Sequence, residues 1–334
     1  MHHSFPARRR ATRRNHYDVT DLVRISHPAE VLEAIEEILR RRYPSVELAP
    51  LRQAMDTFGR LYAGWLPGHL GCDTWYHDAQ HSLDCALAMA RLIDGHDLAS
   101  APEQRLGARR AVLGVIAALF HDSGYVRRAE DSAANGAEFT LSHVQRSGDF
   151  LRRYLPELGF AAEAELAGRI VHFTGYEVAL DRIEVSDPAD RMLGFLLGTA
   201  DVLAQTADRC YLEKCRDCLY PEFEICGLAG APGPGRPTPI YASAEDLLLH
   251  TPEFNRKLWA ERLDGYFGGA HRYLKDHFGG RDPYSECVAE NLERISTLIG
   301  SGSFAGMNRR VKVIGAAEMR AILGAEPGSL ARAA

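Results

Sequence analysis

Two adjacent polar residues, His121 and Asp122, follow an unbroken apolar run in this sequence. The run covers residues 111–120 (AVLGVIAALF) and predicts a buried helix. An imidazole and a carboxylate at the end of such a helix cost free energy unless a partner compensates both groups. A divalent metal ion is such a partner, because imidazole nitrogens and carboxylate oxygens both ligate transition metals. The pair therefore predicts a metal site.

Further imidazole and carboxylate side chains could complete this site. They are flanked by apolar residues and comprise His77, His81, His143, His172 and Asp201. His77 and His81 lie four residues apart, a spacing that places both on one face of a helix. Taken alone, each residue is more often a core histidine or an ion-pair partner than a metal ligand. Their distribution over successive predicted helices is nevertheless what a helical bundle needs to bring ligands to one centre.

The ordered set resembles the HD-domain superfamily of metal-dependent phosphohydrolases over about residues 75–215. The resemblance implies a helical bundle with two metal ions. The first ion would be held by His81, His121, Asp122 and Asp201. The second would be held by His143 and His172, with Asp122 bridging the two. These donor types suit divalent transition metals such as Fe, Mn, Zn or Ni, with Mg an option at the second site.

The segment YHDAQHSLDC, residues 76–85, is similar to the YHNxxHxxD motif of class I cyclic-nucleotide phosphodiesterases, with Asp78 in place of Asn. The resemblance implies that His77 is a general acid and that Asp84 orients a histidine from outside the ligand shell. A hydroxide between the metals, which Asp122 bridges, would attack phosphorus while His77 protonates the leaving oxygen. Three residues after the HD turn are candidates for substrate contact, or for plain packing and solvation: Tyr125, Arg127 and Arg128.

These features predict a metal-dependent phosphohydrolase acting on a small, nucleotide-like phosphoester, with a 3′,5′-cyclic nucleotide as the best guess. Two alternatives stay open: an HD-type mixed-valent di-iron oxygenase, which the same six ligands would suit, and a non-catalytic, ligand-sensing HD domain.

The formal net charge of −6 disfavours a general nucleic-acid binder. No apolar stretch approaches the length of a membrane span. Seven cysteines without a secretory signal favour reduced thiols and a cytoplasmic location, and a homodimer stays open.

Helical periodicity dominates the chain and predicts an all-α fold. Helices are expected over residues 28–43, 48–62, 75–93, 103–121, 142–155, 161–173, 190–219, 243–250, 254–278 and 284–299. They would form one catalytic domain over residues 28–300. Residues 1–27, which begin with an Arg-rich stretch, predict a disordered basic tail. Residues 301–334 predict a second tail, with a short strand at 310–314 and a short helix at 316–323.

Four cysteines offer a rival metal motif. Cys210, Cys215, Cys218 and Cys226 have the spacing C-x4-C-x2-C-x7-C, whose first part matches the plant-type ferredoxin pattern. The first three also continue the helix predicted over residues 190–219, and helical geometry separates Cys210 from Cys215. Both interpretations stay open, a structural metal or cluster site and plain buried thiols, and the second is favoured.

Overall fold

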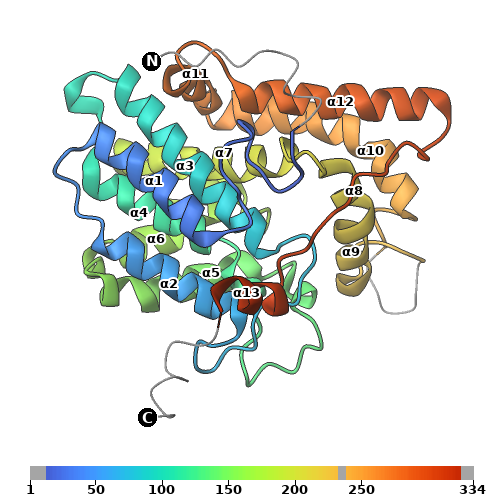
Figure 1. Cartoon of the computed structure of the whole chain (residues 1–334), viewed down its shortest axis with the longest axis horizontal. Helices are drawn as coiled ribbons and strands as arrows, with labels where there is room; N and C mark the ends of the chain where they lie inside the picture. Colours follow the sequence, from blue (N-terminus) through green and yellow to red (C-terminus); the bar gives the residue numbers. More distant parts are fainter. Residues whose placement is uncertain (1–12, 232–237, 325–334) are drawn as a thin grey trace.

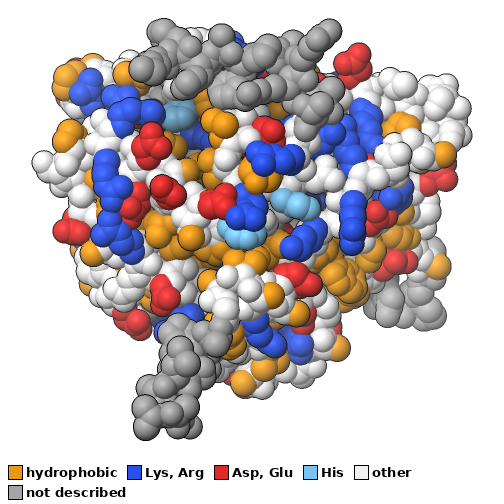
Figure 2. All heavy atoms as spheres, in the orientation of Figure 1, with side chains coloured by type: hydrophobic (Ala, Val, Ile, Leu, Met, Phe, Trp, Pro, Cys, Tyr) orange, Lys and Arg blue, Asp and Glu red, His pale blue; other side chains and the backbone are white. Residues whose placement is uncertain are grey.

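The computed structural model of this chain describes residues 13–231 and 238–324. Over these ranges the fold is all-α, as predicted from the sequence, and strand pairing is limited to isolated bridges without a sheet (Figure 1). None of the helices in the described part is long and apolar enough to cross a membrane. Acidic and basic side chains are interspersed over the face drawn in Figure 2.

Helix α3 (Ala79–Ala99) is the central element of the fold. Its residues are buried from Ala79 to Asp97, although its first turn also carries polar groups. It packs against helices from distant parts of the chain: α1 (Pro28–Arg42), α4 (Gly107–Phe120), α7 (Pro188–Thr206) and α11 (Tyr273–His277). A helix buried on all sides is a suitable support for polar side chains that must be held in the interior.

The remaining helices surround this centre. On one side lie α2 (Ala49–Ala63), α5 (His143–Tyr154) and α6 (Ala164–Ile170). The other side is built from α8 (Tyr211–Lys214), a π-helix (Cys215–Leu219), α9 (Tyr220–Cys226), α10 (Ala244–Lys257), a second π-helix (Leu258–Tyr266) and α12 (Pro283–Ser301). Figure 1 shows α10 and α12 side by side along one edge. A smaller apolar cluster around Leu212, Leu248 and Ile295 joins these elements.

Several helices begin or end where a local side chain or turn interrupts the predicted pattern. Helix α3 begins at Ala79 rather than near residue 75, because the Asp78 carboxylate accepts the backbone N–H of His81 and caps the helix. The region predicted as one helix over 190–219 divides after Thr206 into α7, α8 and the first π-helix. The helix predicted over 161–173 is α-helical only in α6, with 3-10 turns on both sides.

The prediction of a disordered tail over residues 1–27 is wrong for its described part. Residues 1–12 lie outside the described residues, but residues 13–27 pack on the bundle. Arg13 donates through Nη2 to the carbonyl oxygen of Ala207 at 2.7 Å. Asp18, which is 1% exposed, forms a buried ion pair with Arg91 of α3. Such pairing removes the cost of burying either charge alone, so this segment is ordered despite its charge.

The C-terminal segment holds the start of α3. The predicted short helix is confirmed as α13 (Ala316–Leu323), whereas residues 310–314 are extended without a sheet neighbour and do not form the predicted strand. Ile314 instead donates its N–H to Asp78 Oδ2 at 2.7 Å and accepts the N–H of Ala79 at 3.2 Å. Figure 1 shows this segment running from α12 to α13. Residues 325–334 of the predicted tail lie outside the described residues.

Candidate metal centre

Four buried side chains from three helices and their flanking turns lie close together. His81 belongs to the first turn of α3, His121 and Asp122 follow α4, and Asp201 belongs to α7. His81 Nε2 lies 3.2 Å from His121 Nε2, 3.4 Å from Asp122 Oδ2 and 3.1 Å from Asp201 Oδ1. His121 Nε2 lies 3.2 Å from Asp122 Oδ2 and 3.5 Å from Asp201 Oδ1. The helices therefore bring together the four residues predicted for the first metal.

The donor set fits a divalent metal ion. Neighbouring ligand atoms around an ion at about 2.0–2.2 Å lie about 3.0–3.6 Å apart, which is the spacing found here. Asp122 Oδ2 is buried and accepts no hydrogen bond, so a cation would satisfy an otherwise unpartnered atom. Burial alone would raise the pKa of Asp122 and of Asp201, but the adjacent imidazoles lower both. His81, His121 and Asp201 form a group able to hold a metal ion.

Hydrogen bonds outside this group orient its members. His121 donates from Nδ1 to the carbonyl oxygen of Ala118 at 2.8 Å, which leaves Nε2 free to ligate a metal. Asp201 Oδ1 accepts from Gln205 Nε2 at 2.6 Å, one turn further along α7. Tyr76 in turn donates its hydroxyl to Gln205 Oε1 at 3.4 Å. His121 and Asp201 are thus each oriented toward the centre by a second contact.

His143 lies beside the first site, but His172 does not join it. His143 Nε2 is 3.6 Å from Asp122 Oδ1, and its Nδ1 donates to Thr140 O at 2.8 Å. Among the described residues, the His172 side chain has no hydrogen bond, ion pair or ring contact, and its buried Nδ1 is unpartnered. Burial and Arg152 of α5 lower the pKa of His172. The arrangement therefore gives the predicted second site two neighbouring ligands, Asp122 and His143.

His77 occupies the turn before α3 and is held by a residue that the sequence reasoning missed, Glu222 of α9. His77 Nδ1 lies 2.6 Å from Glu222 Oε2. Glu222 Oε1 also accepts the backbone N–H groups of Trp75 and Tyr76, both at 2.6 Å. The glutamate is fully buried, and it fixes both the turn and the imidazole ring. No spacing pattern marked Glu222, which is one of several acidic residues on a short helix 145 positions away.

His77 and His81 therefore do not share the predicted helix face. Because Asp78 begins the helix, the two rings reach the same region from a turn and from α3, with centroids 6.4 Å apart. Burial alone would lower the pKa of His77, but the Glu222 carboxylate outweighs burial and the pKa is raised. His77 is thus suited to carry a proton at the edge of the metal centre.

Tyr125 packs between two of the candidate site histidines. Its buried ring stacks on His77 and on His143, with centroids 4.2 Å from each. Its hydroxyl lies 3.5 Å from His77 Nε2. The tyrosine therefore lines the region between the acid and the second ligand pair, and its contact with a substrate stays a prediction.

The two arginines after the HD turn are engaged elsewhere. Arg127 donates through Nε to Asp73 Oδ2 at 2.7 Å and through Nη1 to Ala133 O at 2.9 Å. The backbone of Arg128 pairs with His69 in an isolated bridge, and its N–H is bound by Asp131. Both arginines stabilise loops. Among the described residues, neither has a hydrogen bond or ion pair with the group of two histidines and two aspartates.

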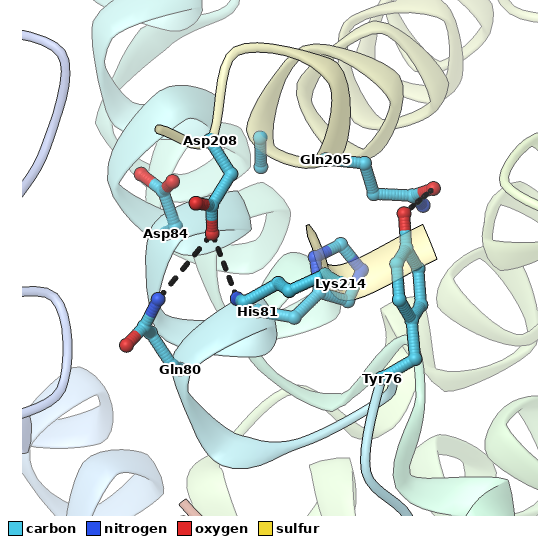
Figure 3. Close-up of a pocket in the computed structure, with 8 residues that line it drawn as sticks. Tyr76, Gln80, His81, Asp84, Gln205, Asp208 and Lys214 are labelled. Carbon is cyan, nitrogen blue, oxygen red and sulfur yellow. Dashed lines mark hydrogen bonds and ion pairs between the residues drawn. The ribbon is translucent and has the colours of Figure 1, made fainter. Parts of the chain in front are cut away.

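Asp84 is buried behind the centre. It lines a cavity of about 10 Å³ together with His81, Asp208 and Lys214 (Figure 3), which is space for roughly one water. Burial raises the pKa of Asp84 to about 7, with Asp208 adding to the effect, and its Oδ1 has no partner. Asp84 thus lies in the layer behind His81, and its predicted role in orienting a histidine stays a prediction.

The cysteine motif does not form a metal site within the described part of the chain. Its members are free thiols: Cys210 lies just before α8, Cys215 and Cys218 lie on the first π-helix, and Cys226 ends α9. Burial raises the pKa of Cys218 to about 12, so this thiol stays protonated. The metal-capable group found among the described residues contains no cysteine, which agrees with the interpretation as plain buried thiols.

Comparison with known protein families finds no matching family model. A comparison with curated proteins likewise finds no match. The chemistry that this site can perform follows from its residues. They are a buried group of two histidines and two aspartates, a third histidine beside this group, and a histidine–glutamate pair at its edge.

Proposed function

We propose that this protein is a metal-dependent phosphohydrolase that cleaves a phosphoester in a nucleotide-like substrate. The supporting observation is the placement of the His77–Glu222 pair beside the group formed by His81, His121, Asp122 and Asp201. Hydrolysis of a phosphoester needs an activated water, charge stabilisation at phosphorus and a proton for the leaving oxygen. The metal ligands would hold the ions that activate water and stabilise charge at phosphorus, and His77 would supply the proton.

The metal ligands divide into two unequal sets. His81, His121, Asp122 and Asp201 would hold one divalent transition-metal ion, and Asp122 with His143 would hold a second. Divalent ions in such sites activate water and stabilise charge on phosphoryl oxygens. Two imidazoles and two carboxylates suit Fe, Mn, Zn or Ni at the first site, whereas the second site has fewer nitrogen donors and leaves room for Mg.

His77 would supply the proton. Its Nδ1 donates to Glu222, so Nε2, which has only the long contact with the Tyr125 hydroxyl at 3.5 Å, is the nitrogen that would protonate a leaving oxygen. The carboxylate raises the pKa of His77 and favours the imidazolium form that a general acid requires. Because Glu222 also binds the backbone of Trp75 and Tyr76, the ring direction is set before any substrate binds.

The spacing His77-x3-His81 makes a 3′,5′-cyclic nucleotide the first substrate to test. The alternative of a di-iron oxygenase draws on the same six predicted ligands, and the paired acid His77, which hydrolysis needs, favours hydrolysis. The presence of a complete first ligand set and a paired acid favours catalysis over a purely ligand-sensing role.

The test compares substrates that differ in their need for an acid. Protein reconstituted with Mn²⁺, Fe²⁺, Ni²⁺ or Mg²⁺ is assayed with cyclic nucleotides, nucleoside phosphates and bis(p-nitrophenyl) phosphate. His77→Gln should lower turnover of a cyclic nucleotide by about 10²–10⁴-fold, but should hardly affect the nitrophenyl ester, whose leaving group needs no proton. His250→Gln, at an exposed position on α10, is the matched control.

Two results would contradict the proposal. The first is the absence of turnover with every substrate under every metal. The second is iron with an EPR signal of a half-reduced pair together with oxygen consumption, which would favour the oxygenase instead.

A further inference from the structure

Arg262 is a buried cation without an acidic partner among the described residues. It lies within the second π-helix (Leu258–Tyr266), and 7% of its surface is exposed. Its Nη2 donates to the carbonyl oxygens of Phe173 and Gly175, at 2.7 and 3.0 Å. Its Nε and Nη1 are buried and have no hydrogen-bond partner. The guanidinium otherwise contacts aromatic rings, with Tyr176 at 4.3 Å and Phe267 at 5.6 Å from its central carbon.

Such an environment is unfavourable for a positive charge. Two carbonyl groups and two ring faces offset part of the desolvation cost, but they do not neutralise the charge. Each unpartnered N–H adds a further penalty because it has lost its water. π-Helices are rare and are often found at functional sites. A permanently charged, under-bonded guanidinium in this setting indicates a place for an anion.

The two carbonyl groups that Arg262 binds lie beside elements of the metal centre. A Cβ at Gly198 would lie 2.6 Å from Phe173 O, so this carbonyl packs directly on α7 three residues before Asp201. A Cβ at Gly175 would lie 2.5 Å from the Val144 side chain, which follows His143. The two carbonyls that Arg262 binds therefore lie against the elements that carry a ligand of each proposed metal.

Access to the guanidinium depends on Tyr176. This ring covers the cation, yet the residue is 70% exposed, which is unusual for a large aromatic side chain. An exposed ring gains little from burial, so its displacement costs little free energy. A ligand that reaches Nε and Nη1 would thus have to move one solvent-exposed side chain.

We propose that Arg262 binds a second anionic group, a phosphate or a carboxylate, of the molecule whose phosphoester is cleaved at the metal centre. This inference rests on the proposed function for the identity of the ligand, but the anion site itself can be measured without catalysis. It narrows the substrate class to phosphoesters that carry an additional negative charge. A cyclic mononucleotide, which the spacing of His77 and His81 makes the first substrate to test, has no such group, and the inference therefore ranks it below phosphoesters that carry one.

The first test measures anion binding in metal-free protein. The thermal unfolding midpoint is followed in EDTA against inorganic phosphate or acetate at constant ionic strength. Either anion should raise the midpoint of the wild type, and the stronger response identifies phosphate or carboxylate. Arg262→Leu should abolish the response, whereas Arg169→Leu, at an exposed position on α6, should keep it.

A second variant keeps the test decisive if Arg262→Leu does not fold. Tyr176→Glu places a carboxylate where the ring lies over the guanidinium. It should raise the midpoint without added anion and remove the response to phosphate and acetate. Leu98→Glu, an equally simple charge addition at the exposed end of α3, should retain the response.

The third measurement uses two phosphodiesters with the same scissile bond, ApA and pApA, which differ by a terminal phosphate. The wild type should prefer pApA by at least tenfold in kcat/KM, and Arg262→Leu should remove this preference. An equal anion response in wild type and Arg262→Leu, or no response in the wild type, would overturn the inference whatever the turnover. Absence of turnover with Arg262-dependent anion binding would instead count against the proposed hydrolase alone.

Discussion

At the scale of single residues, the direction of proton transfer is set by the partner of His77. Glu222 binds Nδ1 and two backbone N–H groups, so its carboxylate has no freedom to turn away. A histidine without this contact could present either nitrogen to a substrate. The buried carboxylate therefore converts an ordinary imidazole into an oriented acid.

We expect Glu222→Gln to lower kcat/KM for a substrate with a poor leaving group by about 100-fold. The glutamine amide would donate to Nδ1, which places the single proton of the neutral ring on Nε2 and removes the carboxylate that stabilises the imidazolium. Metal content, measured by elemental analysis, should stay unchanged. Glu224→Gln on the same helix, at an exposed position, is the control, and an equal loss in both variants would contradict the assigned role.

At the scale of elements, the start of α3 links the candidate site to the end of the chain. Asp78 caps the helix through the N–H of His81 and also accepts the N–H of Ile314. The C-terminal segment therefore supports the turn that carries His77 and the first turn that carries His81. The Asp78 carboxylate therefore both positions the residues of the site and stabilises the fold around them.

Asp78→Ala should lower the free energy of unfolding by about 2–4 kcal/mol, the sum of a lost helix cap and an unpartnered buried N–H. Urea denaturation gives this value, and metal titration should show weaker binding in the same variant. Asp282→Ala removes a comparable cap, on α12 and away from the site. The control should lose stability but keep the metal affinity, and similar metal affinities for both variants would contradict the coupling.

The N-terminal segment is anchored on α3 by a charge that depends on pH. Burial alone would raise the pKa of Asp18, but Arg91 and the bonds from Thr20 and Val23 lower it below its ordinary value. A carboxyl whose pKa is lower in the folded state stabilises the fold above its unfolded pKa. This contribution is lost as the pH falls below about 4.

Asp18→Asn should therefore cost about 3 kcal/mol at pH 7, because it leaves Arg91 as an unpaired buried charge. The difference from the wild type should shrink as the pH falls from about 5 toward 2. Chemical unfolding across this range measures both stabilities. Asp21→Asn, which removes an ion pair with the exposed Arg14, should change stability by less than about 1 kcal/mol. A pH-independent difference for Asp18→Asn would be incompatible with this account.

At the scale of the whole molecule, the metal site joins parts of the fold that are distant in sequence. Helices α3, α4 and α7 pack on one another, and each contributes a ligand from within the helix or from the residues that follow it. Without a cation, two imidazoles and two carboxylates face one another in the interior. Metal binding should therefore stabilise the entire bundle, because the ligands come together only when it is folded.

We expect removal of metal by EDTA to lower the unfolding midpoint of the wild type. The stabilisation amounts to about 2.7 kcal/mol at a free metal concentration 100 times Kd. His81→Ala should lose this response and most of its bound metal, whereas His250→Ala should keep both. An unchanged metal content in His81→Ala would contradict the site. Calorimetry with elemental analysis provides the measurement.

The sequence predicted local features well and long-range pairings poorly. The buried run before His121 and the amphipathic pattern of α1 specify helices, and the fold is all-α. The sequence did not show how Asp84 and His172 lie relative to the ligands, because neither spacing nor flanking residues fix how a short element is rotated. Asp84 lines a small cavity with His81, and the His172 side chain has no hydrogen bond or ion pair among the described residues. The order of residues 13–27 was missed because it depends on a buried ion pair with α3.

The sequence by itself determined the helices, the polar pair at the end of α4 and the residue types of a metal site. These features arise from periodicity and neighbouring residues, which act over a few positions of the chain. Only the tertiary structure decided that Glu222 binds His77 across 145 positions and that Arg262 is buried with no acidic partner in the described part of the chain. Helical periodicity tells which face of a helix is buried, but packing of the whole bundle decides which groups that face meets.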